Sequence, residues 1–99
     1  MPTKILLEAI ARKNCIEAVY NRSAVKLAPH ILYTRHGEIY LDAVTMAREG
    51  KPPREVKIGS FKVTGLSEVA LAPDGFRTQP VFEPEAERYA GVTLFAIEP

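Results

Sequence analysis

The chain has no tryptophan, only one cysteine and only two histidines among its 99 residues. The single cysteine, Cys15, excludes an internal disulfide, and we expect it to lie buried in a strand as a small apolar side chain. With so few sulfur and imidazole ligands and no Cys-x-x-Cys pair, a structural zinc site is excluded as well. We therefore expect a protein without a metal or any other cofactor.

Long apolar segments and enzyme motifs are also missing. No run approaches the roughly 18 apolar residues of a membrane-spanning helix, and the N-terminus lacks the basic-then-apolar layout of a signal peptide. There is no Gly-rich phosphate loop, no nucleophile elbow and no metal-ligand spacing. We expect a soluble, cytoplasmic, non-catalytic protein with no membrane partner.

What the chain does contain fits one domain. Apolar residues make up 46% of the chain and charged residues 25%, at a length near the lower end for a self-sufficient core. The net charge of +1 is unevenly spread, because residues 1–71 hold 11 Lys and Arg against 7 Asp and Glu, whereas residues 72–99 hold 2 against 5. The basic part is either ordinary solvated surface or an anion-binding face that the acidic tail partly shields.

The apolar pattern predicts a mainly β fold with one helix at the N-terminus. Thr3 can cap an amphipathic helix that begins at Lys4 and ends near Asn14. Alternating apolar residues and turn signals then predict a series of strands. These cover residues 15–20, 25–34, 38–46, 54–58 and 66–71, with a last strand within residues 89–97.

Prolines and glycines predict where the strands bend. Pro29 implies an edge, a bulge or a bend, and residues 35–37 end in a glycine that suits a hairpin turn. The strand over residues 38–46 is apolar on both faces, so we expect it to be central. The apolar pattern changes phase after Ile58, which a β-bulge at Gly59 would restore. Residues 73–75, Pro-Asp-Gly, predict a turn.

Three motifs follow one another at close spacing, over residues 26–32, 37–43 and 54–58. With them, residues 4–71 resemble the WYL domain, a small β-barrel of the Sm/SH3 type. The resemblance implies one domain over residues 1–99, in which the helix and barrel occupy residues 4–71 and a C-terminal β extension occupies residues 72–99. The extension is apolar enough that we expect it to pack on the barrel or on a second subunit.

Individual positions carry the resemblance. Lys26 stands where the family usually has an arginine a few residues before its proline, here Pro29. Tyr40 and Leu41 match the last two letters of the family name, and Arg54 opens its arginine-rich strand. The chain departs from the family at two positions, where Ile39 replaces the tryptophan and Ser60 replaces a second arginine.

WYL domains are mostly sensor domains of bacterial transcriptional regulators, and some bind single-stranded nucleic acid through basic and aromatic residues. The resemblance thus implies a ligand face in this chain, with a group of polar residues on it. The members are Tyr20, Lys26, His30, Tyr40 and Arg54. Such regulators usually place a winged helix-turn-helix ahead of this domain. Because only one short helix is expected here, we expect no sequence-specific binding of duplex DNA by this chain alone.

The residues themselves leave alternatives open at each position of this group. Arg54 shares strand parity with Ile58, so we expect it to point toward the apolar side, where a cation needs a partner. That partner is either an anionic ligand or an internal carboxylate, and the chain offers Glu17, Glu38 and Asp42. Tyr40 is either a base-stacking residue or a half-buried strand aromatic. His30 is expected at the surface or at a pocket rim.

We therefore predict a non-catalytic ligand-binding or regulatory module. Its ligand would be anionic, either a nucleotide-like metabolite or a short single-stranded nucleic acid, held by Lys26 and Arg54 with Tyr40 and His30 beside them. The alternative is a structural subunit whose ligand pocket has decayed, as Ile39 and Ser60 would allow. Such a subunit would oligomerise, most simply as a homodimer, or dock on a partner protein.

Overall fold

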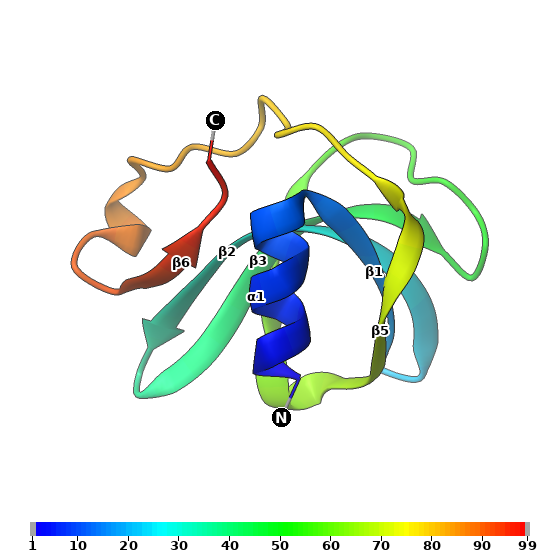
Figure 1. Cartoon of the computed structure of the whole chain (residues 1–99), viewed down its shortest axis with the longest axis horizontal. Helices are drawn as coiled ribbons and strands as arrows, with labels where there is room; N and C mark the ends of the chain where they lie inside the picture. Colours follow the sequence, from blue (N-terminus) through cyan, green and yellow to red (C-terminus); the bar gives the residue numbers. More distant parts are fainter. Residues whose placement is uncertain (1, 99) are drawn as a thin grey trace.

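One helix lies across the face of a curled antiparallel sheet in a computed structural model that describes residues 2–98 (Figure 1). The mainly β fold with an N-terminal helix is confirmed. In chain order the elements are α1 (Thr3–Arg12), β1 (Asn14–Tyr20), β2 (Ser23–Arg35), β3 (Glu38–Arg48), β4 (Ile58–Lys62), the 3-10 turn η1 (Val63–Gly65), β5 (Leu66–Gly75), the 3-10 turn η2 (Glu87–Tyr89) and β6 (Thr93–Ala96).

The strands form one sheet in the order β4-β3-β2-β1-β5, and β6 pairs with β2. The long strand β2 has a different neighbour along each half of one edge. Its first half pairs with β1 as far as Leu27, and its second half pairs with β6 from Ile31 to Tyr33. The two end strands, β4 and β5, are joined by η1 alone, so the sheet must curl to bring its ends together. Within residues 2–98, β4 and β5 do not pair, and the sheet is open.

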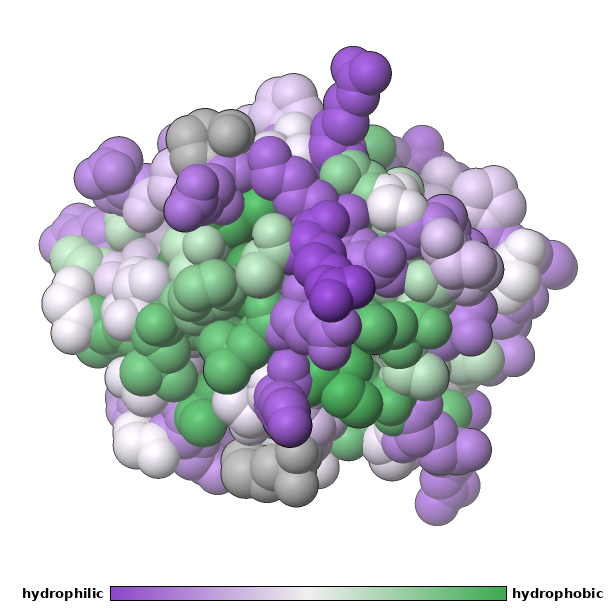
Figure 2. All heavy atoms as spheres, viewed as in Figure 1, coloured by the Kyte–Doolittle hydropathy of each residue, from purple (hydrophilic) through white to green (hydrophobic). Residues whose placement is uncertain are grey.

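The helix α1 fills the concave side of this sheet. Its apolar face buries Leu6, Ala9 and Ile10, and its polar face produces the hydrophilic stripe down the middle of this side of the molecule (Figure 2). The helix ends at Lys13, whose left-handed conformation (φ 55°) lets its backbone N–H donate to Ile10. The predicted cap is wrong, because Thr3 is the first helical residue and its side chain makes no capping hydrogen bond.

The strand predictions hold for the first three strands. The β2–β3 hairpin turns through His36 and Gly37, both with positive φ. At Pro29 the register with β3 shifts, since Pro29 pairs with Ala43 while Ile31 pairs with the next residue, Asp42. The predicted irregularity at Pro29 is therefore confirmed as a bulge that leaves the residue after it unpaired. The predicted central position of β3 is confirmed as well, since it lies between β2 and β4.

Two predictions for the segment after β3 are wrong. Residues 54–57 form no strand, because the loop of residues 49–57 contains Pro52 and Pro53, which cannot donate ladder hydrogen bonds. The strand β4 begins at Ile58 and pairs with β3 in unbroken register, without a bulge at Gly59. Phe61 is buried in the main core, and Ile58 packs against both this core and the smaller cluster of Cys15, Ala28, Val44 and Ala72.

The predicted turn at residues 73–75 is also wrong, because β5 continues through Gly75. The side chain of Asn14 explains why, since its Nδ2 donates to Ala72 O at 2.7 Å and so holds the end of β5 beside β1. A register shift between Asn14 and Ile16 accommodates the Pro-Asp-Gly sequence within the strand.

Of the predicted C-terminal extension, residues 72–75 belong to β5, and residues 76–98, to which the name is applied from here on, pack on the chain's own sheet. Their large apolar side chains Phe82, Tyr89 and Ile97 are buried in the main core. The strand β6 is shorter than predicted, and it occupies the edge of β2 that β1 leaves uncovered. The extension thus packs on its own chain here, and packing on a second subunit stays a prediction. Among residues 2–98, no helix has the length and apolar character needed to cross a bilayer.

Candidate anion-binding groove

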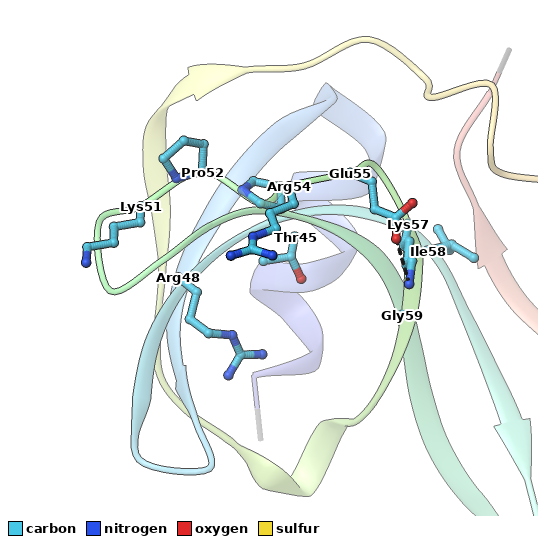
Figure 3. A pocket seen from close by; sticks show the side chains of 10 residues that line it. Thr45, Arg48, Lys51, Pro52, Arg54, Glu55, Lys57, Ile58 and Gly59 are labelled. Carbon is cyan, nitrogen blue, oxygen red and sulfur yellow. Dashed lines mark ion pairs between the residues drawn. The ribbon is translucent and has the colours of Figure 1, made fainter.

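An open groove of about 560 Å³ lies beneath the loop of residues 49–57, between the end of β3 and the start of β4 (Figure 3). Four of its ten lining residues are basic and one is acidic, and the other five supply mostly apolar surface. The lining residues are Thr45, Arg48, Lys51, Pro52, Pro53, Arg54, Glu55, Lys57, Ile58 and Gly59.

Local backbone structure pairs the first two basic residues of the lining. Arg48 ends β3, and Glu49 and Gly50 form a tight turn with φ values of 51° and 77°. Lys51 then returns opposite Arg48, and the two residues exchange backbone hydrogen bonds of 2.9 and 3.0 Å. In such a hydrogen-bonded pair the Cα atoms lie about 5.5 Å apart. The turn thus places the backbones of two basic residues across from each other at the groove, while their side chains diverge (Figure 3).

Arg54 lies at the centre of the groove. Figure 3 shows its guanidinium over Thr45, between Arg48 and the Glu55–Lys57 pair, while Lys51 extends away from the other cations. Glu55 is the one acidic residue of the lining, and its carboxylate is 2.9 Å from Lys57 Nζ. Within residues 2–98, no carboxylate lies within ion-pair distance of Arg48, Lys51 or Arg54.

The surroundings of Arg54 differ from the sequence-based expectation. It does not point into the apolar side of a strand, because it belongs to the loop and is exposed. Two of the three carboxylates considered for it have other partners: Glu38 bonds Lys62 at 2.7 Å, and Asp42 lies 3.4 Å from Arg88. Arg54 is therefore available to a ligand in the groove.

Lys26 lies elsewhere and already has a partner. Its Nζ is 2.9 and 3.0 Å from the two carboxylate oxygens of Asp74. This hydrogen-bonded pair raises the pKa of Lys26 and lowers the pKa of Asp74. Lys26 lines a second cavity of about 410 Å³, together with residues of β1 and Gly50, and not the groove of Arg54.

His30 is fully buried, so the expectation of a surface or rim position is wrong. The bulge after Pro29 turns the imidazole inward, and the C-terminal extension covers it. Its Nδ1 donates to Ala28 O at 2.8 Å and its Nε2 accepts from the Gln79 backbone N–H at 3.0 Å, in the tautomer that satisfies both partners. The rings of Phe76 and Phe82 lie about 5 Å away. Burial lowers the pKa of His30.

The aromatic residues of the predicted group are also distant from the groove. Tyr40 is half-buried at the hairpin end of β3, stacked on Tyr33 at 6.0 Å with the Arg35 guanidinium 5.3 Å from its ring. Five residues of strand separate it from Thr45, which is about 17 Å. Tyr20 packs edge-on against Phe61 at 5.0 Å. Of the predicted site residues, only Arg54 lines the groove.

Sequence reasoning missed the other groove cations, Arg48, Lys51 and Lys57. The sequence does contain a pattern that could have revealed these cations. Together with Arg54, they occupy every third position around the segment Gly-x-Pro-Pro. A strand assignment for residues 54–58 hid this spacing, since alternate residues of a strand face opposite sides.

A second polar group that the sequence did not reveal surrounds Asp42, whose side chain is 1% exposed. Three hydroxyl groups donate to its carboxylate: Tyr33 at 2.7 Å, Ser60 at 2.6 Å and Tyr89 at 2.5 Å. Burial raises the pKa of both Tyr33 and Tyr89. The only signal in the sequence is a charged residue in the middle of an apolar strand. Since all its donors belong to the chain itself, we assign this group a structural role.

No cluster of three or more His, Cys, Asp or Glu side chains in the described chain could hold a metal ion. Comparison of the chain with models of protein families, with curated proteins and with solved structures found no match.

Proposed function

We propose that this chain is a non-catalytic binding module that holds an anionic ligand in the basic groove. The ligand would be a nucleotide-like metabolite or a short single-stranded nucleic acid, and binding would serve a regulatory role of the kind that WYL sensor domains have. One observation carries the proposal: Arg54 lies at the centre of a groove with Arg48 and Lys51, and none of the three has a carboxylate partner within residues 2–98. Unpaired guanidinium groups favour bidentate binding of phosphate or carboxylate.

The proposal includes a WYL-like fold of the Sm/SH3 type. Its support is geometric, because the two end strands of the sheet order, β4 and β5, are connected by the three-residue turn η1. A sheet whose first and last strands are that closely joined is curled nearly into a barrel. The two residues that depart from the WYL pattern have structural contacts in this fold. Ile39 packs against the main core, and the Ser60 hydroxyl donates to Asp42.

The alternative, a subunit that assembles through its C-terminal extension, stays a prediction. The large apolar residues of the extension, Phe82, Tyr89 and Ile97, are already buried within one chain. Assembly with a second copy is thus not needed to shield these residues from water.

The test is a titration of the protein with two fluorescent probes, a labelled nucleoside triphosphate and a labelled short single-stranded oligonucleotide, at low and moderate salt. We expect saturable binding that weakens with salt, as counterion release requires. Because hydrogen bonds to charged groups contribute about 1.5–3 kcal/mol, Arg54→Ala should weaken binding about tenfold or more. Arg77→Ala removes the same charge from the exposed start of the C-terminal extension and should change affinity much less. Flat curves with both probes at both salt concentrations would contradict the proposal.

A further inference from the structure

The carboxylates near the groove do not neutralise its positive charge. Arg48 and Lys51 are paired through their backbones, and within residues 2–98 no carboxylate lies within ion-pair distance of either side chain. The nearest acidic neighbour in the sequence, Glu49, is engaged elsewhere, because its carboxylate accepts from the Ala24 backbone N–H at 2.9 Å. Glu55 is engaged by Lys57. A ligand that brings several negative charges into the groove would neutralise these unpaired cations.

The lining offers hydrogen-bond donors but very few acceptors. Lysine and arginine side chains only donate. Side-chain acceptors of the groove are limited to the Thr45 hydroxyl and the carboxylate of Glu55. A nucleobase edge presents both donors and acceptors, whereas phosphate oxygens only accept. The lining therefore complements phosphate groups better than it complements bases.

No aromatic side chain lines the groove, and Pro52, Pro53 and Ile58 supply its apolar surface. Stacking on aromatic rings is the usual source of affinity for unpaired bases. Tyr40, the aromatic residue predicted for that role, lies about 17 Å along β3 from Thr45. A base therefore has no aromatic stacking partner among the residues that line this groove.

The start of the loop is tied to the sheet. Pro52 and Pro53 each fix one backbone dihedral, and two hydrogen bonds, Glu49 N–H to Ala24 O and Ala24 N–H to the Glu49 carboxylate, tie the turn to the start of β2. A preorganised site loses little conformational entropy on binding. Its volume, about 560 Å³, lies within the range of small-molecule sites.

From these observations we propose that the groove recognises a condensed phosphate group, the diphosphate or triphosphate of a small ligand, and does not read a base. Arg48 and Arg54 bind the phosphate oxygens and Lys51 neutralises charge at the rim, while the organic part of the ligand remains outside the groove. A phosphodiester strand carries its charges singly along the chain, whereas a condensed phosphate concentrates several charges in one group, as the clustered cations require. This inference rests on the proposed function and specifies the ligand class of the same groove.

The experiment measures dissociation constants by calorimetry in magnesium-free buffer at fixed salt. The ligands are inorganic triphosphate, the four common nucleoside triphosphates, a nucleoside monophosphate and a short single-stranded oligonucleotide. We expect inorganic triphosphate and all four nucleoside triphosphates to agree within about threefold, and the monophosphate to bind at least about tenfold more weakly, since each tenfold step corresponds to about 1.4 kcal/mol. Arg48→Gln and Arg54→Gln should each weaken triphosphate binding about tenfold, and Arg77→Gln should not.

The outcomes separate the two proposals. If affinity depends strongly on the base, or if the monophosphate or the oligonucleotide binds as tightly as triphosphate, the inference is overturned while the anion-binding function stands. Binding of triphosphate that is unchanged in both groove variants also overturns it, since the site then lies elsewhere. If none of the anions binds, the proposed function fails together with the inference. Inorganic triphosphate that binds as tightly as the nucleoside triphosphates identifies the phosphate group itself as the recognised chemistry.

Discussion

At the scale of single residues, two charged side chains of neighbouring segments have opposite environments. Asp42, in β3, is buried and accepts hydrogen bonds from three hydroxyl groups of the chain. Arg54, in the following loop, is exposed and has no carboxylate within ion-pair distance among residues 2–98. Since a buried charge is tolerated only when it is well hydrogen-bonded, Asp42 serves the fold, whereas Arg54 remains available for binding.

The role of Asp42 predicts the effect of a small change in its partner. Tyr89→Phe removes the hydroxyl that donates to Asp42 Oδ2 at 2.5 Å but keeps the buried ring. Because hydrogen bonds to charged groups contribute about 1.5–3 kcal/mol, we expect the free energy of unfolding to fall by about 2 kcal/mol in urea denaturation. Tyr40→Phe is the matched control, since the Tyr40 hydroxyl makes no hydrogen bond within residues 2–98, and it should cost less than about 0.5 kcal/mol. Equal losses in the two variants would contradict the structural role of the Asp42 group.

At the scale of elements, the C-terminal extension contributes a strand to the sheet and contacts two other strands. Its strand β6 pairs with the second half of β2, its Tyr89 binds Asp42 on β3, and the Gln79 backbone N–H binds His30 on β2. Each contact joins the extension to a strand that lies much earlier in the sequence. The extension and the sheet should therefore unfold together.

This arrangement predicts a pH dependence of stability. Burial lowers the pKa of His30 in the folded protein, so below pH of about 6.5 the unfolded chain binds a proton more readily than the folded one. The free energy of unfolding should thus decrease as the pH falls from 8 through 6.5, and level off once the folded-state pKa is passed. The slope can reach about 1.4 kcal/mol per pH unit from this group. Urea denaturation at a series of pH values measures it.

Two variants assign the pH effect to one imidazole. His30→Phe keeps an aromatic ring between Phe76 and Phe82 but cannot be protonated, so the loss of stability between pH 8 and pH 6 should shrink. His36→Asn changes the other histidine, which is exposed in the β2–β3 turn, and should leave the pH dependence as it is. The same slope in the wild type and in His30→Phe would show that His30 is not the responsible group.

At the scale of the whole molecule, the basic groove and the acidic C-terminal part are separate. None of the groove lining comes from residues 72–98, the described part of this segment. Among the acidic residues of that part, Asp74 pairs with Lys26 and so neutralises a cation outside the groove. The acidic tail therefore does not shield the groove, and the fold leaves a local positive potential that attracts anions.

The sequence predicts those parts of the fold that local residue patterns determine. The first three strands and their hairpin turn were predictable because alternation and a glycine at positive φ act over a few residues. Residues 54–58 alternate like a strand as well, yet residues 54–57 lie in the loop that follows Pro52 and Pro53, and only Ile58 pairs with β3. The burial of His30 depends on residues 76–82, some fifty positions later in the chain, and no local pattern encodes such a contact.

The groove itself was partly predictable. Arg54 was predicted as a site residue, as the first residue of a strand and in a group with Lys26, His30 and Tyr40; its binding role stays a prediction, and the structure shows that it lines the groove. The fold separates these residues, because β2 and β3 carry them to different parts of the sheet. The actual neighbours, Arg48 and Lys51, come from the tight turn at Glu49 and Gly50, whose geometry places them across from each other.

The most direct test of anion binding at this groove is a chemical-shift map. Inorganic triphosphate would be titrated into isotope-labelled protein, and the shifts of the backbone amides and arginine side chains followed by NMR. We predict saturable changes concentrated at Thr45, Arg48, Arg54 and Gly59, with much smaller changes around Lys26 and Tyr40. Changes centred on Lys26 or Tyr40, or no saturable change at any residue, would contradict binding of a condensed phosphate in the groove.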